Sequence, residues 1–430
     1  MEQGLISTLD FRPFAAWRYH SGAVQIGQVI APPYDVISPA EREILYAKSP
    51  YNVVRLILGK EPNFYDHAAL CWQEWSQKGV LTQDQTPAIY LYEQAFKHPL
   101  DGRPFSRLAL VGILKLDESG PVLRHEATFD APKRDRLMLL EKTKTNLSPI
   151  FGLYQNAKSF QTVFSAYRPT PPLFETQDDQ GITHRGWAIQ NQADCETIRK
   201  ALADQKILIA DGHHRYETAL EYQRRMHEKS PDPSGEMDFD FVMMALVASD
   251  DPGLLVLPTH RIVKSLSPYS EKEFLEHLSE FFKLTSCSDE EALTALNKNG
   301  VKPNVFAGVF GNAGSLLFEF NHLKSAAKFL PQNKPPVWYE VDANLLMNLV
   351  FHGLMGVAPE KKQSLIEYTR SSEEAIRAVR QRRAEAAFLL QTPQVDTIRQ
   401  LAYAGERMPQ KTTYFYPKLA SGFFFYHHGI

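Results

Sequence analysis

Residues 207–220 read Ile-Leu-Ile-Ala-Asp-Gly-His-His-Arg-Tyr-Glu-Thr-Ala-Leu, and this stretch decides the fold. The apolar run at its start predicts a short buried strand that ends at Asp211, because a strand buried on both faces is apolar throughout. Gly212 permits a tight turn, and a helix is expected directly after it. The same alternation of short strands and helices recurs along the chain and indicates a mixed α/β fold.

The start of this helix combines features of an anion-binding site. Helix N-termini present free backbone N–H groups and the positive end of the helix dipole. His213, His214 and Arg215 stand in the first turn, where cations oppose the dipole and lower stability. We therefore expect Asp211, Gly212 and the three basic residues to hold a phosphate group. The alternative is that Asp211 caps the helix and balances the charge of Arg215, with the histidines half-buried.

The composition is that of a globular protein of near-neutral charge. The 430 residues include 47 Lys and Arg against 50 Asp and Glu, a net charge of −3, and 43% are hydrophobic. These values exclude disordered and collagen-like chains and argue against binding to nucleic acid through bulk charge. The length fits two or three domains. We expect one region at 1–265, which contains the phosphate site, and a C-terminal α/β domain at 266–430.

Other features bear on the cellular compartment. No run of about 18 uncharged apolar residues predicts a membrane-spanning helix. The first ten residues lack the basic and apolar segments of a signal peptide. Cys71, Cys195 and Cys287 are odd in number and far apart, which fits a reducing environment. We therefore expect a cytoplasmic protein that does not contact a membrane.

A second segment places candidate side chains after a rigid turn. The apolar residues 24–31 predict a strand that Pro32 and Pro33 terminate. Tyr34 and Asp35 would then project from the strand end, where α/β proteins bind ligands. The alternative is a structural turn in which the Asp35 side chain bonds to the backbone.

The neighbouring patterns extend this prediction. Ser38-Pro39-Ala40-Glu41 is a capping box that opens a helix, and Ser270-Glu271-Lys272-Glu273 is another. The apolar residues 53–58 predict a short strand. Residues 88–96 and 106–116 predict an antiparallel hairpin.

Three further charged positions are candidates for chemistry. Glu126 follows a histidine and could act as a general base or a metal carboxylate. The basic residues between 133 and 136 could neutralise phosphate, although a solvated helix start is the favoured reading. His260 and Arg261 follow an apolar strand and are candidate substrate contacts, with a packed histidine as the alternative.

Several well-known motifs do not occur in the sequence. There is no Gly-x-x-x-x-Gly-Lys-Ser/Thr, Gly-x-Gly-x-x-Gly, Gly-x-Ser-x-Gly or His-Glu-x-x-His pattern. His213 and His214 are adjacent, so on a helix they point about 100° apart, whereas helical zinc ligands are three or four residues apart. We predict no zinc site and assign no side chain as a dedicated metal ligand.

Five segments resemble a known bacterial family, catalogued as domain of unknown function 1015. They are residues 30–38, 49–58, 125–154, 207–220 and 405–422. This family is similar to the ParB/sulfiredoxin-like superfamily, whose phosphate loop is Gly-x-x-Arg at a helix start, and Gly212 and Arg215 match those two positions. The resemblance implies a ParB/sulfiredoxin-like nucleotide-binding core within 1–265. One branch of the superfamily phosphorylates free L-serine with ADP or ATP, so the resemblance implies that activity here.

Two departures from the superfamily narrow the function. Sulfiredoxin has a cysteine directly after the loop glycine, whereas this chain has His213, so reduction of a sulfinic acid is not expected. ParB proteins add a helix-turn-helix and a basic surface, and the sequence shows neither. Nucleic acid is therefore not an expected partner.

These observations lead to one functional hypothesis and two alternatives. We predict a kinase that transfers phosphate from ATP or ADP to the hydroxyl of a small metabolite, with free L-serine expected. Residues 211–215 would bind the phosphates, Glu126 or Asp35 would be the catalytic base, and Mg²⁺ would bridge the phosphates. Tyr34, His260 and Arg261 would contact the substrate. The alternatives are a non-catalytic nucleotide-binding regulatory protein and, with less support, a ParB-type protein associated with nucleic acid.

Overall fold

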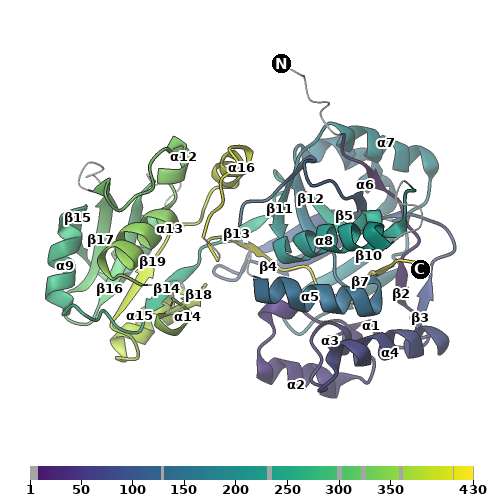
Figure 1. Ribbon diagram of the computed structural model, residues 1–430, viewed down its shortest axis with the longest axis horizontal. Helices are drawn as coiled ribbons and strands as arrows, with labels where there is room; N and C mark the ends of the chain where they lie inside the picture. The colour runs from purple at the N-terminus through teal and green to yellow at the C-terminus, as the bar shows by residue number, and fades with distance from the viewer. Residues whose placement is uncertain are drawn as a thin grey trace. The chain divides into compact units, whose positions relative to one another are not determined.

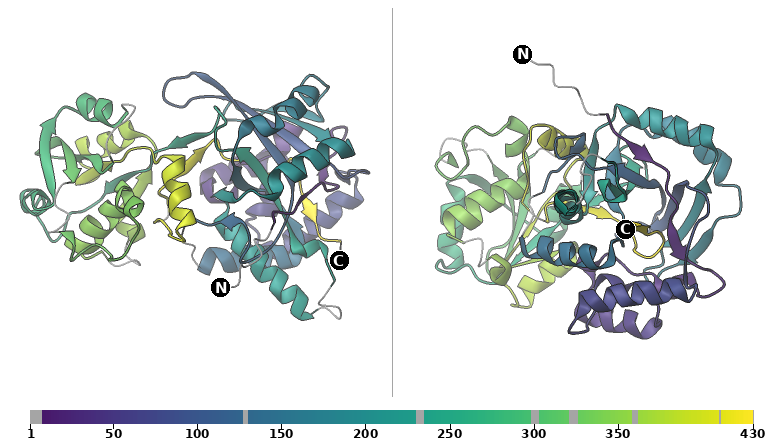
Figure 2. Two further views of the ribbon diagram at one scale, coloured as in Figure 1. Left: turned by 90° about the horizontal axis from the view of Figure 1, so that it is seen from above. Right: turned by 45° about the vertical axis from the view of Figure 1, so that its right-hand side comes forward.

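The chain folds into two compact units. The computed structural model describes residues 8–126, 130–229, 235–297, 303–320, 326–357, 362–409 and 411–429. The first unit comprises residues 1–124, 128–255 and 417–430, and the second comprises residues 125–127 and 256–416. The C-terminal segment thus returns to the first unit (Figure 2), whereas the sequence analysis assigned all of 266–430 to a separate domain.

A mixed sheet forms the centre of the first unit. Among the described residues it has nine strands, in the order β6-β11-β8-β12-β5-β4-β10-β9, with β1 paired to β5. The register of β4 with β5 confirms the predicted hairpin. Every residue of β12 is buried, and β12 pairs antiparallel with β5 and parallel with β8. The strands are β1 Phe11–Arg12, β4 Ile89–Lys97, β5 Pro104–Lys115, β6 Val122–Leu123, β8 Ile150–Tyr154, β9 Phe174–Gln177, β10 Thr183–Ile189, β11 Ile207–Asp211 and β12 Phe241–Ala248.

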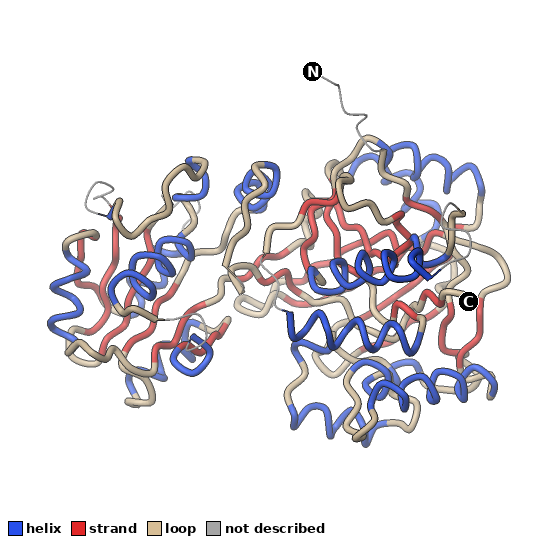
Figure 3. Tube along the Cα trace, in the orientation of Figure 1, coloured by secondary structure: helices blue, strands red, loops and turns tan. Residues whose placement is uncertain are grey.

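Helices pack against this sheet and against one another. Helix α8 (His213–Lys229) lies beside α5 (Asp130–Thr143), which contacts α4 (Phe64–Gln77), as Figures 1 and 3 show. Tyr216 and Ala219 of α8 reach the main apolar core of the sheet. The other elements of this unit are α1 Ile26–Val29, η1 Tyr34–Val36, α2 Pro39–Lys48, α3 Val54–Ile57, η2 Ala157–Phe160, α6 Gln161–Tyr167, α7 Gln192–Ala203, η3 Asp238–Asp240, β2 Trp17–Tyr19, β3 Leu81–Gln83, β7 Thr145–Asn146 and β21 Tyr426–His427.

The second unit has its own sheet and core. Within the described residues the sheet has six strands in the order β15-β17-β16-β19-β14-β18. Apolar residues of α10 and α15, such as Ala292 and Ala378, pack on this sheet. Its elements are β14 His260–Val263, α9 Glu271–Ser279, β15 Phe282–Cys287, α10 Asp289–Asn297, β16 Val305–Phe310, β17 Gly314–Phe320, α12 Pro336–Tyr339, α13 Asp342–Leu345, the π-helical η4 Leu346–Leu354, α14 Lys362–Leu365, β18 Ile366–Thr369, α15 Ser372–Arg380, β19 Ala386–Leu389 and α16 Val395–Tyr403. Strands β13 (Leu255–Leu257) and β20 (Tyr414–Tyr416) lie where the chain passes from one unit to the other.

Both predicted capping boxes are confirmed. The Ser38 hydroxyl accepts the Glu41 N–H at 3.3 Å, and the Glu41 carboxylate accepts the Ser38 N–H at 2.8 Å. Ser270 and Glu273 make the same pair of bonds. These caps satisfy backbone donors that have no partner within the helix. None of the described helices is long and apolar enough to cross a bilayer.

Two predicted strands are wrong, because residues 24–31 and 53–58 contain the short helices α1 and α3. The buried side chain of Asn52 bonds to the backbone of both segments. Its amide group donates to two carbonyls of the first segment, at 2.9 and 3.1 Å, in the place of a neighbouring strand. Its side-chain oxygen accepts the Val54 N–H at 3.0 Å and so starts α3. A single buried amide therefore replaces the ladder that a strand would need.

Candidate functional site

The turn between β11 and α8 has the predicted strand–glycine–helix form. Strand β11 ends at Asp211 and the helix starts at His213. Gly212 has φ +92°, in the left-handed region that favours glycine. A Cβ atom at Gly212 would lie 2.9–3.0 Å from the guanidinium atoms of Arg215. Glycine therefore suits the backbone conformation, and a Cβ atom there would oblige the end of the Arg215 side chain to shift.

Asp211 contacts two cations at this turn. Its Oδ2 accepts a hydrogen bond from Nη2 of Arg215 at 2.8 Å, and its Oδ1 accepts one from Nζ of Lys418. Arg215 also donates from Nη1 to the carbonyl of Pro149 at 2.5 Å, which links α8 to the start of β8. Burial alone would raise the pKa of Asp211, but the charges of Lys418 and Arg215 outweigh it and the pKa is lowered. The ion pair with Arg215 agrees with one part of the capping alternative.

Asp35 has a second carboxyl group whose pKa responds to these charges. It lies in η1, a single helical turn directly after Pro32 and Pro33, and is exposed to solvent. The surrounding protein limits its hydration and raises its pKa, and the charge of Asp211 raises it further. Lys418 and Arg215 oppose this shift. A carboxyl group with a raised pKa that solvent still reaches is suited to accept a proton.

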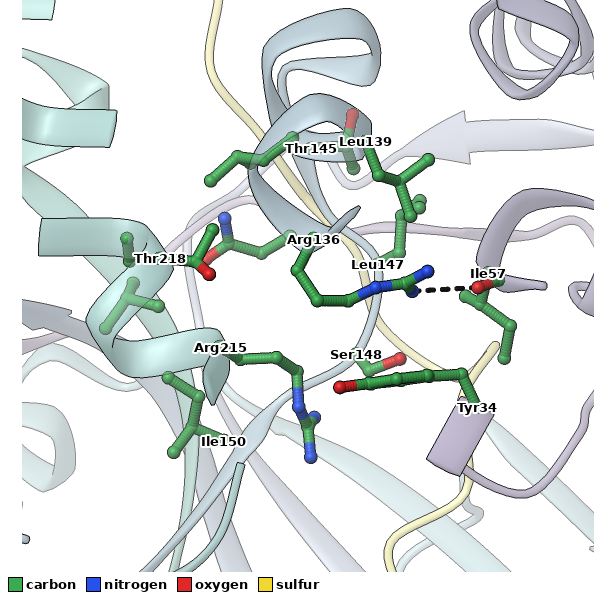
Figure 4. A pocket seen from close by; sticks show the side chains of 14 residues that line it. Tyr34, Ile57, Arg136, Leu139, Thr145, Leu147, Ser148, Ile150, Arg215 and Thr218 are labelled. Atoms are coloured by element: carbon green, nitrogen blue, oxygen red, sulfur yellow. Dashed lines mark hydrogen bonds between the residues drawn. The ribbon is translucent and has the colours of Figure 1, made fainter. Parts of the chain in front are cut away.

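A small pocket lies beside these side chains, and Figure 4 shows its lining. Tyr34, Arg136, Ser148 and Arg215 all line it. The Arg136 guanidinium stacks 4.0 Å from the centre of the Tyr34 ring and donates to the carbonyl of Ile57 at 2.8 Å. The cavity volume is about 60 Å³, enough for a few water molecules. Seven aliphatic side chains line the pocket together with these polar groups, so its lining is mixed in character.

The C-terminal segment supplies a residue that sequence reasoning missed. Lys418 lies 207 positions after its partner Asp211, and its side chain is 11% exposed. Gln94 donates to the Lys418 carbonyl at 3.1 Å, and the buried Arg107 donates to the Pro417 carbonyl at 2.5 Å. The family resemblance of residues 405–422 was the signal that could have drawn attention to this lysine.

The two histidines of the turn are shielded from solvent to different degrees. His213 is 4% exposed, and His214 is half-buried. Burial lowers the pKa of His214, and the carboxylate of Glu217 opposes this only in part. Burial therefore favours the neutral form of His214. The permanent positive charge at the helix start comes from Arg215.

The remaining predicted site residues belong to the second unit. Glu126 accepts the backbone N–H of Lys411 at 2.8 Å, so its carboxylate is tied to the segment before β20. His260 and Arg261 lie on β14 and are 4% and 1% exposed. Nδ1 of His260 accepts the Leu390 N–H at 3.2 Å, and burial with the charge of Arg261 lowers the pKa of His260 to about 4. These contacts fit the alternative of a packed histidine, and the structure does not bring these three residues into one unit with Asp211.

Comparison with known proteins places the chain in a family. The model of the family described as protein of unknown function (DUF1015) matches residues 11–394. The chain belongs to this family. No curated protein matches the sequence.

Solved structures similar to this DUF1015 protein are remote. A conserved hypothetical protein from Pyrococcus furiosus aligns at 13% identity and a TM-score of 0.35, over 73% of this chain and 93% of its own. A free serine kinase mutant in complex with ADP aligns at 13% identity and a TM-score of 0.36, over 70% and 86%. SbnI with a C-terminal truncation, from Staphylococcus aureus, aligns at 9% identity and a TM-score of 0.35, over 72% and 85%.

Asp35 and Asp211 are the two carboxyl groups of the candidate site that could contact a magnesium ion, and both oxygens of Asp211 already accept hydrogen bonds from Arg215 and Lys418. Within the described residues, no three or more His, Cys, Asp or Glu side chains are grouped so that they could hold a metal. Mg²⁺ is usually held by one or two carboxylates together with phosphate oxygens and water. The donor set therefore fits a magnesium ion that arrives with a nucleotide, and does not fit one held by side chains alone.

Proposed function

We propose that this DUF1015 protein is a nucleotide-dependent kinase that phosphorylates the hydroxyl group of a small metabolite, with free L-serine as the first acceptor to test. One observation carries the proposal. Asp211, Arg215 and Lys418 are hydrogen-bonded to one another through Asp211 at the N-terminal end of α8, and their charges act on the carboxyl group of Asp35. Phosphoryl transfer needs charge neutralisation, alignment and a group that accepts the hydroxyl proton. The cluster contains a candidate for each requirement.

The phosphates of ATP or ADP would bind at the turn between β11 and α8. Backbone N–H groups at the start of this 17-residue helix point toward such an anion. Arg215 can bind a phosphate through two parallel hydrogen bonds. Asp211 and the Pro149 carbonyl already hold the guanidinium in place, so little side-chain entropy is lost on binding.

Asp35 would accept the proton of the acceptor hydroxyl. The hydroxyl oxygen forms a bond to the terminal phosphorus while its proton passes to the Asp35 carboxylate. The bond from phosphorus to the bridging oxygen breaks, and the shortened nucleotide leaves with the electron pair. The raised pKa of Asp35 favours this proton transfer. A bound Mg²⁺ would offset the charge on the phosphoryl oxygens, with Asp35 or Asp211 as its protein ligand.

The proposal is tested by product formation. The full-length protein is incubated with Mg²⁺, ATP or ADP, and a panel of amino acids and sugars, and new phosphate esters are sought by mass spectrometry. We expect O-phospho-L-serine from serine. Asp35→Asn should lower kcat by roughly 100-fold or more, the usual size of a general-base effect. Arg215→Met should mainly raise the nucleotide KM.

Two further variants complete the design. Arg224→Met is the matched control, because Arg224 lies on the same helix, is exposed and pairs with Glu221 away from the turn. It should behave as the wild type. Glu126→Gln tests the other candidate base, and a loss there with full activity in Asp35→Asn would transfer the role to Glu126.

Nucleotide binding without any phosphate ester would reject the kinase and leave the regulatory alternative. Binding alone would be seen as a thermal shift with ATP or ADP, since a ligand that binds only the folded state stabilises it. No binding of either nucleotide would reject the site itself.

A further inference from the structure

Residues 417–422, called the C-terminal strap below, are bonded to three different parts of the first unit. The first part is the central sheet. Arg107 on β5 and Gln94 on β4 donate to the carbonyls of Pro417 and Lys418. Arg107 is 1% exposed, so the strap closes over a buried charged group. A buried guanidinium needs such acceptors, which makes this attachment strong.

The second and third parts are the segments that precede Asp35 and β8. Ala31 and Ser421 exchange two backbone hydrogen bonds of 3.2 and 2.8 Å. The Ser421 hydroxyl bonds to the Ser148 hydroxyl at 2.6 Å. Gly422 has φ +106°, and a Cβ atom there would lie 3.3 Å from the Ile30 Cα, so the strap passes close to that segment. The strap therefore ties the sheet to the segments before Asp35 and β8.

This arrangement brings Lys418 to a defined place. Its ammonium group contacts Oδ1 of Asp211, while Arg215 contacts Oδ2, so one carboxylate serves two cations. The charges of Asp211, Lys418 and Arg215 also act on the carboxyl group of Asp35. Asp211, Arg215 and Lys418 together carry two positive charges and one negative charge. An added anion would balance this excess.

We propose that Lys418 binds the phosphoryl group that the kinase transfers, and that its ammonium group passes from Asp211 to a phosphate oxygen when the nucleotide binds. This inference rests on the proposed function and extends it to a residue of the C-terminal strap. Asp211 then keeps Arg215 as its partner and positions Lys418 in the free protein. A lysine suits this role, because its ammonium is a compact charge on a flexible chain that can change partners.

Binding measurements on the full-length protein with Mg²⁺ test the proposal. The dissociation constants of ATP, ADP and AMP are measured by calorimetry for the wild type, Lys418→Met, Lys418→Arg and Lys200→Met. Lys200 is the control, an exposed lysine of α7 that pairs with Glu196. We expect Lys418→Met to bind the phosphate donor at least tenfold more weakly and the product nucleotide, one phosphate shorter, within about twofold of the wild type. Lys418→Arg should recover most of the donor affinity, and Lys200→Met should match the wild type.

An equal loss of affinity for the donor nucleotide and for the product nucleotide in Lys418→Met would overturn the proposal, since it would indicate a general structural defect. Unchanged donor affinity would overturn it as well. Unchanged product affinity in Lys418→Met also shows that the variant is folded. The two proposals can fail separately. If the wild type forms a phosphate ester and Lys418→Met leaves the nucleotide affinities unchanged, only the role of Lys418 is rejected. ADP and ATP binding without product in the wild type rejects only the kinase.

Discussion

Replacing Gly212 by alanine should lower the stability of this protein and damage its proposed phosphate site. Gly212 has φ +92°, and a non-glycine residue in the left-handed region costs about 1–2 kcal/mol. The new Cβ would also stand 2.9–3.0 Å from the Arg215 guanidinium, so that side chain must move. Its 2.8 Å bond to Asp211 would then be weakened.

Gly181 separates these two effects. It also lies in the first unit and has φ +77°, but a Cβ there would meet no atom within 4 Å. Gly181→Ala should therefore lower the free energy of unfolding by the strain alone, about 1–2 kcal/mol. Gly212→Ala should lower it by about 2–4 kcal/mol, because a hydrogen bond between charged groups adds roughly 1.5–3 kcal/mol and part of it is recovered when Arg215 adjusts.

The assay is denaturant unfolding combined with calorimetric titration of ADP and ATP. Both variants should unfold at lower denaturant than the wild type, with Gly212→Ala the less stable. Only Gly212→Ala should bind the nucleotide weakly, by at least tenfold, because only there is Arg215 displaced. Equal nucleotide affinity in Gly212→Ala and Gly181→Ala would refute the placement of the phosphates at this turn.

Three further predictions concern the framework of the fold. Burial raises the pKa of Asp342 to about 7, so the stabilisation that this group contributes is present below about pH 4 and is lost as the pH rises through 7. Between about pH 4 and 8 the free energy of unfolding, measured with urea, should therefore fall by up to about 4 kcal/mol more in the wild type than in Asp342→Asn. Parallel pH curves for the two proteins would contradict this. Arg107→Met leaves the buried acceptors on Gln94 and Pro417 without their donor. This should lower the free energy of unfolding, measured by thermal unfolding, by about 2–4 kcal/mol. A higher melting temperature would mean that removing the buried charge outweighs the loss of these bonds. Ser38→Ala removes the cap of α2 and should lower the free energy of unfolding by about 1 kcal/mol, with the proposed kinase activity unchanged. A loss of that activity at normal stability would reject this purely structural role.

Part of the candidate site could be predicted from the sequence because its geometry is local. The apolar run of β11, the glycine that permits the turn and the helix after it depend on bonds between residues a few positions apart. The same holds for the capping box at Ser38, whose partners are three residues apart. The anion-binding potential of the helix start follows from the helix itself, whatever surrounds it.

Where local patterns were ambiguous, tertiary contacts decided the structure. The apolar residues 24–31 and 53–58 suit either a strand or a helix, and the buried amide of Asn52 selects the helices by bonding to the backbone of both segments. His214 reads as a cation in the sequence, but burial favours its neutral form. Burial depends on the whole fold, so neither result follows from residue spacing.

The sequence by itself determined the fold class, the strand–glycine–helix turn and the choice of Asp211, Gly212 and Arg215 as a phosphate-binding candidate. Only the tertiary structure brought Lys418 to Asp211 across 207 positions. The physical reason is the separation along the chain over which each kind of interaction acts. Backbone hydrogen bonds and helix dipoles act within one element, whereas the pairing of charges from three separate segments depends on how the C-terminal strap packs on the sheet.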